Sequence, residues 1–245
     1  MRITSIRETA APISSEIANA YIDFSKMTCS LVAVTTDLVR DGRPVTGFGF
    51  SSNGRYAAGA IMRDRMIPRL LEAAPDTLLD PANGLLDPFR CWDRMMTNEK
   101  PGGHGERAGA VGVLDMALWD LRARQRGEPA WRTIADYFGR PGDPRVFAYA
   151  SGGHYRDLGD EARDRAALAD EVRGAMELGH TQYKIKVGGA PLDTDRRRID
   201  AALAALGPGC RLAVDANSVF GRDAALAFLD ELDGGYVVKT DGLAA

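Results

Sequence analysis

Two lysines one residue apart, Lys184 and Lys186, lie in the stretch QYKIKVGGAP. They alternate with Ile185 and Val187, a spacing that predicts a strand with both lysines on one face. Adjacent ammonium groups repel and partial burial disfavours their charge, so we expect a depressed lysine pKa and a competent general base. The pattern alone is also typical of an edge strand carrying two solvated lysines, and that alternative stays open.

A carboxylate follows the next predicted strand, in LAVDANS. Asp215 and Asn217 share one face of that strand, opposite Leu212 and Val214. A carboxylate there is suited to a hard divalent cation such as Mg²⁺. Asn217 could bind the metal, position a water or cap the following helix, and DAN is also common in turns. Lys-x-Lys and Asp-x-Asn on adjacent strands are a more specific signal than either alone.

The second half of the chain alternates strand and helix, which predicts parallel pairing through right-handed crossovers. Active sites of such sheets and barrels lie at the carboxyl ends of the strands, where both pairs fall. We expect Ile185 and Val187 to face the helices. The predicted strands span 145–153, 182–189 and 211–220, and the predicted helices span 160–179, 192–207 and 222–234.

The first half predicts strands and then helices. Strands are expected at 2–13 and 30–39, with a hairpin turn at 40–44 and a Gly/Ser-rich segment after it. Helices are expected at 57–73, kinked or started by Pro68, and at 111–127. In the second helix one face is apolar and Gly127 is the stop. That face consists of Val111, Leu114, Leu118 and Leu121.

Composition restricts the classes of protein. The chain has 245 residues, a net charge of −3 and 45% hydrophobic residues, which predicts an ordinary globular protein. It shows no membrane-length apolar run, no signal core and no basic stripe, so we expect neither membrane nor nucleic-acid partners. Cys29, Cys91 and Cys210 are scattered, which favours reduced thiols and a cytoplasmic location. An anion cradle at Gly188 and Gly189 is a weaker interpretation, since no phosphate-loop motif is present.

The stretches KIKVGG, LAVDAN and GVLDMALWD resemble the enolase superfamily, in its mandelate racemase-like branch. ISSEIANAYIDFSKMT, FGFSSNGRY and NEKPGGHGER are similar to loops of the D-tartrate dehydratases within it, and the resemblance extends to about Leu232. It implies an α+β capping domain over residues 1–140. An incomplete (β/α)8 TIM-type barrel, its first three to four β/α units, would occupy residues 141–245.

The resemblance also implies a reaction, in which Mg²⁺ binds a substrate carboxylate and stabilises the enediolate formed by proton removal. Lys186 corresponds to the base, Lys184 to its neighbour at the substrate carboxylate and Asp215 to the first metal ligand, with Asn217 beside it. The implied substrate is a hydroxy-dicarboxylate or acid sugar, and D-tartrate would yield oxaloacetate. The implied substrate contacts are Asn19, Asn53 and Lys100, and a cation such as Lys100 suits a distal carboxylate.

The chain departs from the family pattern in two places. His154 stands where a substrate-contacting tyrosine is expected, and Tyr155 follows it, so either could contact a different substrate. The segment GYVVKTDGLAA lacks the acidic strand end that supplies further metal ligands in the family, and the family's His–Asp dyad is also missing. We therefore expect a truncated form of a homo-oligomeric parent enzyme, inactive as a dehydratase alone. A racemase, another acid-sugar dehydratase and a non-catalytic remnant are the alternatives.

Overall fold

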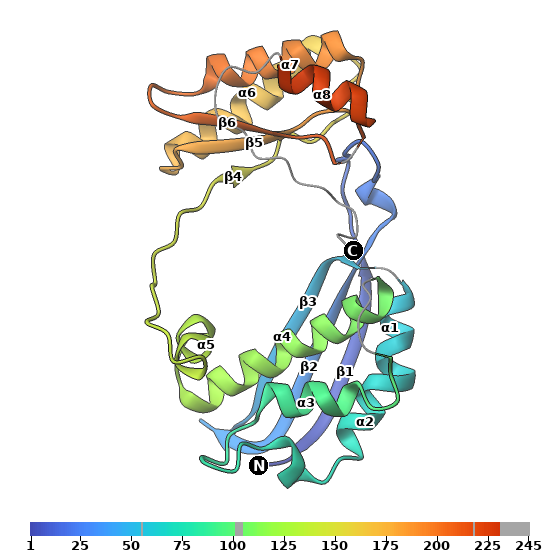
Figure 1. Ribbon diagram of the computed structural model, residues 1–245, viewed down its shortest axis with the longest axis vertical. Helices are drawn as coiled ribbons and strands as arrows, with labels where there is room; N and C mark the ends of the chain where they lie inside the picture. Colours follow the sequence, from blue (N-terminus) through green and yellow to red (C-terminus); the bar gives the residue numbers. More distant parts are fainter. Residues whose placement is uncertain (55, 101–104, 218, 231–245) are drawn as a thin grey trace. The chain divides into compact units, whose positions relative to one another are not determined.

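The computed structural model describes the chain except for residues 55, 101–104, 218 and 231–245. The chain forms two compact units (Figure 1). The first contains Met1–Ile13 and Lys26–Val146, and the second contains Ser14–Ser25 together with the residues from Phe147 onward. No helix in the described part of the chain combines the length and the apolar character that crossing a bilayer requires.

The first unit is built on an antiparallel sheet in the order β1-β2-β3. β1 is Ile3–Pro12, β2 is Thr28–Arg40 and β3 is Arg43–Gly54. Asp41 and Gly42 join β2 to β3 with φ values of 51° and 73°, the left-handed pair that a tight two-residue hairpin requires. The predicted strands and the predicted hairpin turn are confirmed.

Helices cover one face of this sheet. α4 (Glu106–Arg126) runs along it, and Gly47 and Gly49 of β3 let its backbone approach closely (Figure 1). The predicted apolar face of α4 is buried, and the helix ends at Gly127, whose φ is 71°. The other helices described in this unit are α1 (Tyr56–Ile61), a π-helical turn (Met62–Met66), α2 (Ile67–Leu71) with Pro68 near its start, α3 (Pro88–Met95) and α5 (Ala130–Tyr137), with a 3₁₀ turn at Pro75–Leu78. A second 3₁₀ turn, Phe24–Lys26, spans the boundary between the two units. The sequence did not lead us to predict α3 and α5.

The second unit contains a parallel sheet in the order β4-β5-β6, with helices on one face (Figure 1). Its elements are β4 (Ala150–Ser151), α6 (Glu161–Glu177), β5 (Gln182–Lys186), α7 (Leu192–Ala205), β6 (Arg211–Asp215) and α8 (Arg222–Asp230). The predicted strand–helix alternation is confirmed. The incomplete (β/α)8 barrel and the domain boundary at residue 140 stay predictions.

The helix-facing side of β5 forms the core of the second unit. Ile185 and Val187 are buried there with Tyr183, against Leu168 and Val172 of α6. This confirms the predicted direction of Ile185 and Val187. β4 is much shorter than the predicted strand at 145–153, because Val146, Phe147 and Tyr149 are exposed and no ladder forms before Ala150.

The segment Ser14–Ser25 leaves the first unit and joins the second, an excursion that the predicted capping domain of residues 1–140 did not include. Ala18 exchanges two backbone hydrogen bonds with Tyr155, at 3.0 and 2.9 Å. The two ends of the excursion stay together, since the Ile13 amide donates to the Met27 carbonyl at 2.9 Å. The stretch GYVVKTDGLAA and residues 101–104 of the loop EKPGGHGE lie outside the described residues.

Candidate active site

Lys184 and Lys186 converge on one carboxylate oxygen across adjacent strands. β5 and β6 pair in parallel with Lys186 opposite Asp215, so the three side chains lie on the sheet face away from the core. Lys186 Nζ donates to Asp215 Oδ2 at 2.7 Å, and Lys184 Nζ donates to the same atom at 3.0 Å. The lysine side chains are 10% and 14% exposed, so the edge-strand alternative with two solvated lysines is wrong.

Asp215 is held as an anion by its neighbours. Burial alone would raise its pKa, but hydrogen bonds from Lys186, Lys184 and the Asn217 amide lower the pKa of Asp215 well below its ordinary value. Two ammonium groups against one carboxylate leave a net positive charge. This cluster is suited to attract and orient a substrate carboxylate.

Asp215 and Asn217 fit part of a magnesium site. Both offer oxygen ligands, and the Asn217 side-chain oxygen is buried without a hydrogen-bond partner among the described residues. Asn217 has a φ of 48°, and its amide donates to Asp215 Oδ1 at 3.1 Å, so the turn after β6 keeps the two residues together. Mg²⁺ needs about six oxygens, and no group of three or more His, Cys, Asp or Glu in the described residues could hold a metal.

His154 follows β4, and the charges of the two lysines influence it. Burial and the charge of Lys186 lower its pKa, while Glu171 acts in the opposite direction. Phe24, from the excursion out of the first unit, packs edge-on against the imidazole with ring centroids 5.7 Å apart. The charges of Lys186 and Lys184 thus act on His154, which is consistent with a place near the lysines.

The Tyr155 hydroxyl is engaged within the protein. It donates to Asp195 Oδ1 at 2.6 Å and accepts from the Gly189 amide at 2.9 Å. Burial and the hydrogen bond to Asp195 raise the pKa of Tyr155. Its predicted contact with substrate stays a prediction.

The other predicted substrate contacts are spread over both units. Asn19 belongs to the second unit, and its side-chain oxygen accepts from the Tyr21 and Ile22 amides, both at 2.8 Å. Lys100 is exposed in the first unit. Asn53 lies in β3, and its side chain is outside the part that the structure describes. The substrate contacts of all three stay predictions.

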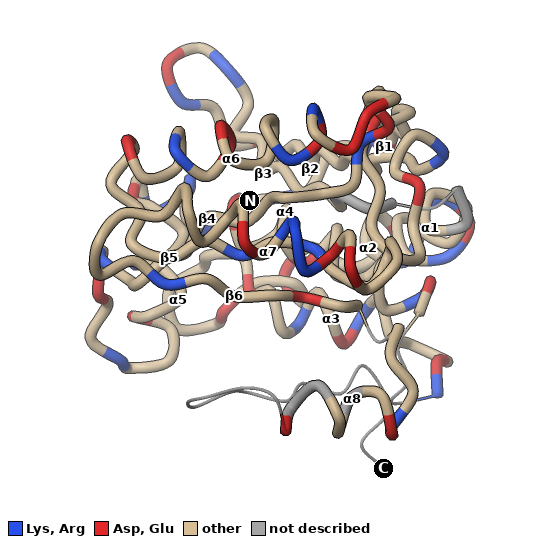
Figure 2. The backbone as a smooth tube through the Cα atoms, turned by 90° about the horizontal axis from the view of Figure 1, so that it is seen from above, with Lys and Arg blue, Asp and Glu red and all other residues tan. Residues whose placement is uncertain are grey.

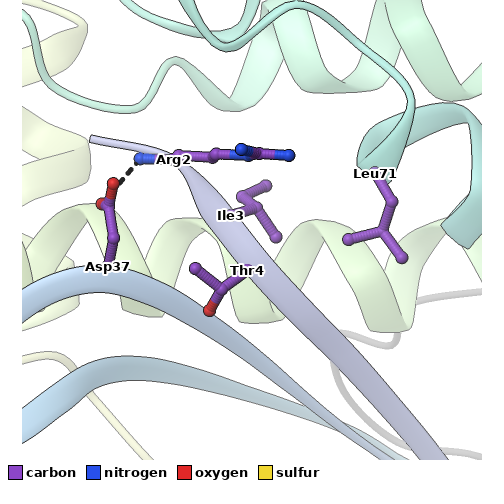
Figure 3. A pocket seen from close by; sticks show the side chains of 5 residues that line it. All are labelled: Arg2, Ile3, Thr4, Asp37 and Leu71. Carbon is purple, nitrogen blue, oxygen red and sulfur yellow. Dashed lines mark hydrogen bonds between the residues drawn. The ribbon is translucent and has the colours of Figure 1, made fainter.

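Other features of the molecule show less chemistry. A hollow of about 420 Å³ in the first unit is lined by two charged residues, Arg2 and Asp37, with Ile3, Thr4 and Leu71, and the Arg2 amide donates to Asp37 (Figure 3). Acidic and basic residues are interspersed along the described chain (Figure 2). The three cysteines are free thiols, and burial raises the pKa of Cys91.

Sequence reasoning missed two buried charged residues beside the site, Asp195 and Arg198 of α7. They are three residues apart, on the same helix face as the buried Ala202. Charged residues inside an otherwise apolar helical stripe are the signal that could have identified them.

Comparisons with known proteins found a matching family and several relatives. Residues 167–238 match the family described as "Enolase C-terminal domain-like". The chain is 28% identical over 136 residues to the arabinonate dehydratase of Saccharolobus solfataricus, covering 55% of this chain and 34% of the relative. It is 29% identical over 187 residues to the 3,6-anhydro-alpha-L-galactonate cycloisomerase of Streptomyces coelicolor, covering 76% and 46%.

A solved structure is similar over most of the chain. It is an enolase from Bradyrhizobium in complex with magnesium and mandelic acid, with 27% identity and a TM-score of 0.63. The match covers 92% of this chain and 56% of that one. The chain spans less than half the length of the two curated relatives above.

Proposed function

We propose that this chain, which belongs to the enolase and mandelate racemase superfamily, carries the proton-abstracting part of a magnesium-dependent acid-sugar dehydratase. The observation that supports the proposal most is the convergence of Lys184 and Lys186 on Asp215 across two parallel strands. A base, a second cation and an anionic metal ligand are the groups that ionisation of a carbon acid requires.

In the proposed reaction Lys186 takes the proton from the carbon beside the substrate carboxylate, and the electron pair of that C–H bond moves into the carboxylate as an enediolate. The hydroxyl on the next carbon then leaves as water after protonation by an acid that we assign to no described residue. The resulting enol tautomerises to a 2-keto acid. Lys186 donates to Asp215 in the structure, so the reactive state has this hydrogen bond released and a neutral amine.

Lys184 orients the substrate carboxylate in this scheme. Asp215 and the buried oxygen of Asn217 would hold Mg²⁺. The ion, when bound, would stabilise negative charge on the substrate carboxylate as a Lewis acid. The low pKa of Asp215 supports the role of ligand, because metal ligands act in the deprotonated form.

The substrate we favour is a hydroxy-dicarboxylate, D-tartrate first, with other acid sugars as the alternative. The three cationic or polar groups at the second unit's site, Lys184, Lys186 and His154, suit an anionic, hydroxylated ligand. The loop resemblance favours tartrate, whereas the curated relatives are named for arabinonate and an anhydrogalactonate. A racemase or cycloisomerase would share the first proton-transfer step and differ in the later steps.

The test measures the proton-transfer step itself. The 245-residue chain is incubated in D₂O with Mg²⁺ and one substrate at a time: D-tartrate, L-tartrate, galactarate or arabinonate. We expect NMR to show loss of the proton beside the carboxylate in at least one substrate, with little keto-acid release, since no acid is assigned. Lys186→Ala should abolish this exchange, and Lys26→Ala is the matched control that should retain it. Exchange that survives Lys186→Ala, or no exchange with any substrate, contradicts the proposal.

Magnesium binding distinguishes a working site from the alternative of a non-catalytic remnant. A ligand of the native state stabilises it by about 2.7 kcal/mol at one hundred times its dissociation constant. We expect Mg²⁺ to raise the melting temperature of the wild-type chain and to leave that of Asp215→Ala unchanged. A remnant without a working site would show no magnesium dependence in either protein.

A further inference from the structure

A cluster of side chains in the second unit consists of the partly buried Tyr155 and the buried Asp195 and Arg198. The Tyr155 hydroxyl donates to one carboxylate oxygen of Asp195 at 2.6 Å, and Arg198 Nε lies 3.8 Å from that oxygen. The guanidinium also lies over the Tyr155 ring, 4.4 Å from its centroid. The Asp195 and Arg198 side chains are 6% and 4% exposed, so this is an ion pair in the interior of the unit.

An interior ion pair is poorly explained by stability alone. Removing two charges from water has a large cost, and apolar residues of similar size would often be as stable. The cost is greater here because Arg198 Nε is buried and makes no hydrogen bond among the described residues. Such a cluster therefore points to a need for geometry, and the question is which part of the protein it holds.

The cluster holds the backbone at the carboxyl ends of β4 and β5. Arg198 donates to the Gly153 carbonyl at 2.7 Å, and the same carbonyl accepts from the Lys186 amide at 3.2 Å. The second oxygen of Asp195 accepts from the Gly188 amide at 2.7 Å. The Tyr155 hydroxyl accepts from the Gly189 amide at 2.9 Å. Both loops are thus tied to α7 by donors and acceptors of fixed direction.

Glycines allow these loops to come so close. Gly153 has a φ of 58°, and a Cβ there would lie 2.7 Å from Cβ of Ile185. A Cβ at Gly189 would lie 2.5 Å from the Tyr155 ring. A side chain at either position would push the loop away from its partner.

We propose that Tyr155, Asp195 and Arg198 are positioning residues, which fix the loops after β4 and β5 so that His154 and Lys186 face the same ligand. The inference rests on the proposed function only for the role of Lys186. It assigns to Tyr155 a task inside the protein, and not the substrate contact that its place in the sequence suggests. Asp195 and Arg198 act through the backbone that they hold and touch no reacting atom.

The experiment uses Tyr155→Phe, which removes one hydroxyl and keeps the ring. We expect amide hydrogen exchange at Gly189, which loses its acceptor, to become about fivefold faster, the equivalent of one net hydrogen bond of roughly 1 kcal/mol. Exchange at Gly188 should also become faster, because its acceptor Asp195 loses the Tyr155 hydroxyl. We also expect the NMR-measured pKa of His154 to rise toward its ordinary value, because the imidazole moves away from Lys186. Exchange in α4 should stay as in the wild type.

Tyr137→Phe is the matched control, since the Tyr137 hydroxyl donates to a carboxylate, Asp87, in the first unit. It should change neither the Gly188 and Gly189 amides nor the His154 titration. Asp195→Asn is a second probe, expected to loosen the Gly188 amide, because the substituted side chain has one acceptor oxygen where the carboxylate has two, and the Gly188 amide and the Tyr155 hydroxyl then compete for it. The NMR signal of His154 is identified as the one that is absent from the spectrum of His154→Gln.

Three results would overturn the inference. The first is wild-type exchange at Gly188 and Gly189 in Tyr155→Phe, and the second is faster exchange throughout the chain, which indicates general destabilisation. The third is unchanged amides and an unchanged His154 pKa with weaker binding of D-tartrate, which indicates a substrate contact. These measurements need neither Mg²⁺ nor turnover, so their outcome is independent of the success of the proposed function.

Discussion

One carboxylate oxygen, Oδ2 of Asp215, accepts hydrogen bonds from two ammonium groups. The direction of these side chains was predictable, since alternation along β5 and β6 fixes which residues share a face. The ion pairs were not predictable, because they depend on the register that sets Lys186 opposite Asp215. A sequence shows the alternation within each strand but not the register between two strands.

The Asp215 carboxylate should make stability depend on pH. Its folded-state pKa is lower than its unfolded-state value, so its contribution is present above the unfolded-state pKa and is lost as the pH falls through the folded-state pKa. At pH 7 we expect Asp215→Asn to lower the free energy of unfolding by about 1 kcal/mol, in the low part of the range for charged hydrogen bonds, since its side chain is 34% exposed. The difference should shrink below about pH 4.

Urea unfolding of both proteins at pH 7 and pH 3 measures this. Asp193→Asn is the control, because that side chain is 79% exposed and should change stability little at either pH. A difference for Asp215→Asn that grows toward acid would contradict the assignment of the low pKa.

At the scale of elements, periodicity predicted the long segments and failed on the short ones. The apolar face of α4 and the alternation of β5 are read directly from the sequence. α3 and α5 are eight residues each, too short for a clear period. α3 begins at the cap Asp87, whose carboxylate accepts from the Phe89 and Arg90 amides, a local signal that periodicity does not detect.

The packing of α4 on β3 predicts that glycine-to-alanine substitutions at two positions change stability in opposite directions. A Cβ at Gly49 would collide with the Val113 carbonyl and Ala117 of α4, so Gly49→Ala should destabilise the first unit by about 1–3 kcal/mol. Gly112 lies on α4 itself with no atom within 4 Å of an added Cβ. Gly112→Ala should therefore stabilise the helix by about 0.5–1 kcal/mol.

Thermal and urea unfolding of the two variants test this pair. Both variants add one methyl group, so a difference between them reflects the position and not the chemical change. Equal effects of both substitutions would mean that α4 does not rest on β3 as closely as the structure places it.

At the scale of the whole molecule, the two units do not follow the order of the chain. Ser14–Ser25 belongs with the residues from Phe147 onward, although it lies between β1 and β2. The sequence marked this segment only through its resemblance to a substrate loop. Its pairing with Tyr155 could not be read from it, since a single bridge at Ala18 leaves no periodic signal.

Removing this excursion should affect one unit and spare the other. The hydrogen bond from the Ile13 amide to the Met27 carbonyl already brings its ends together, so Asn-Gly in place of residues 14–25 should keep β1 paired with β2. Amide protection at Tyr155 should be lost, because its partner Ala18 is gone.

Hydrogen exchange measures both effects. A variant that keeps the length of the segment but replaces it with Gly and Ser separates the lost contacts from the shortened connection, and it should behave like the deletion at Tyr155. Loss of protection in β1 and β2 of the deletion variant would show that the excursion also supports the first unit.

The pairing of Ala18 with Tyr155 also bears on the order of folding. A ribosome releases the excursion long before the segment that receives it, so this early stretch stays unpaired while most of the chain is made. Closing so distant a contact is slow compared with forming a local hairpin. The first residues to emerge thus contain a piece that cannot complete its pairing until Tyr155 has been made.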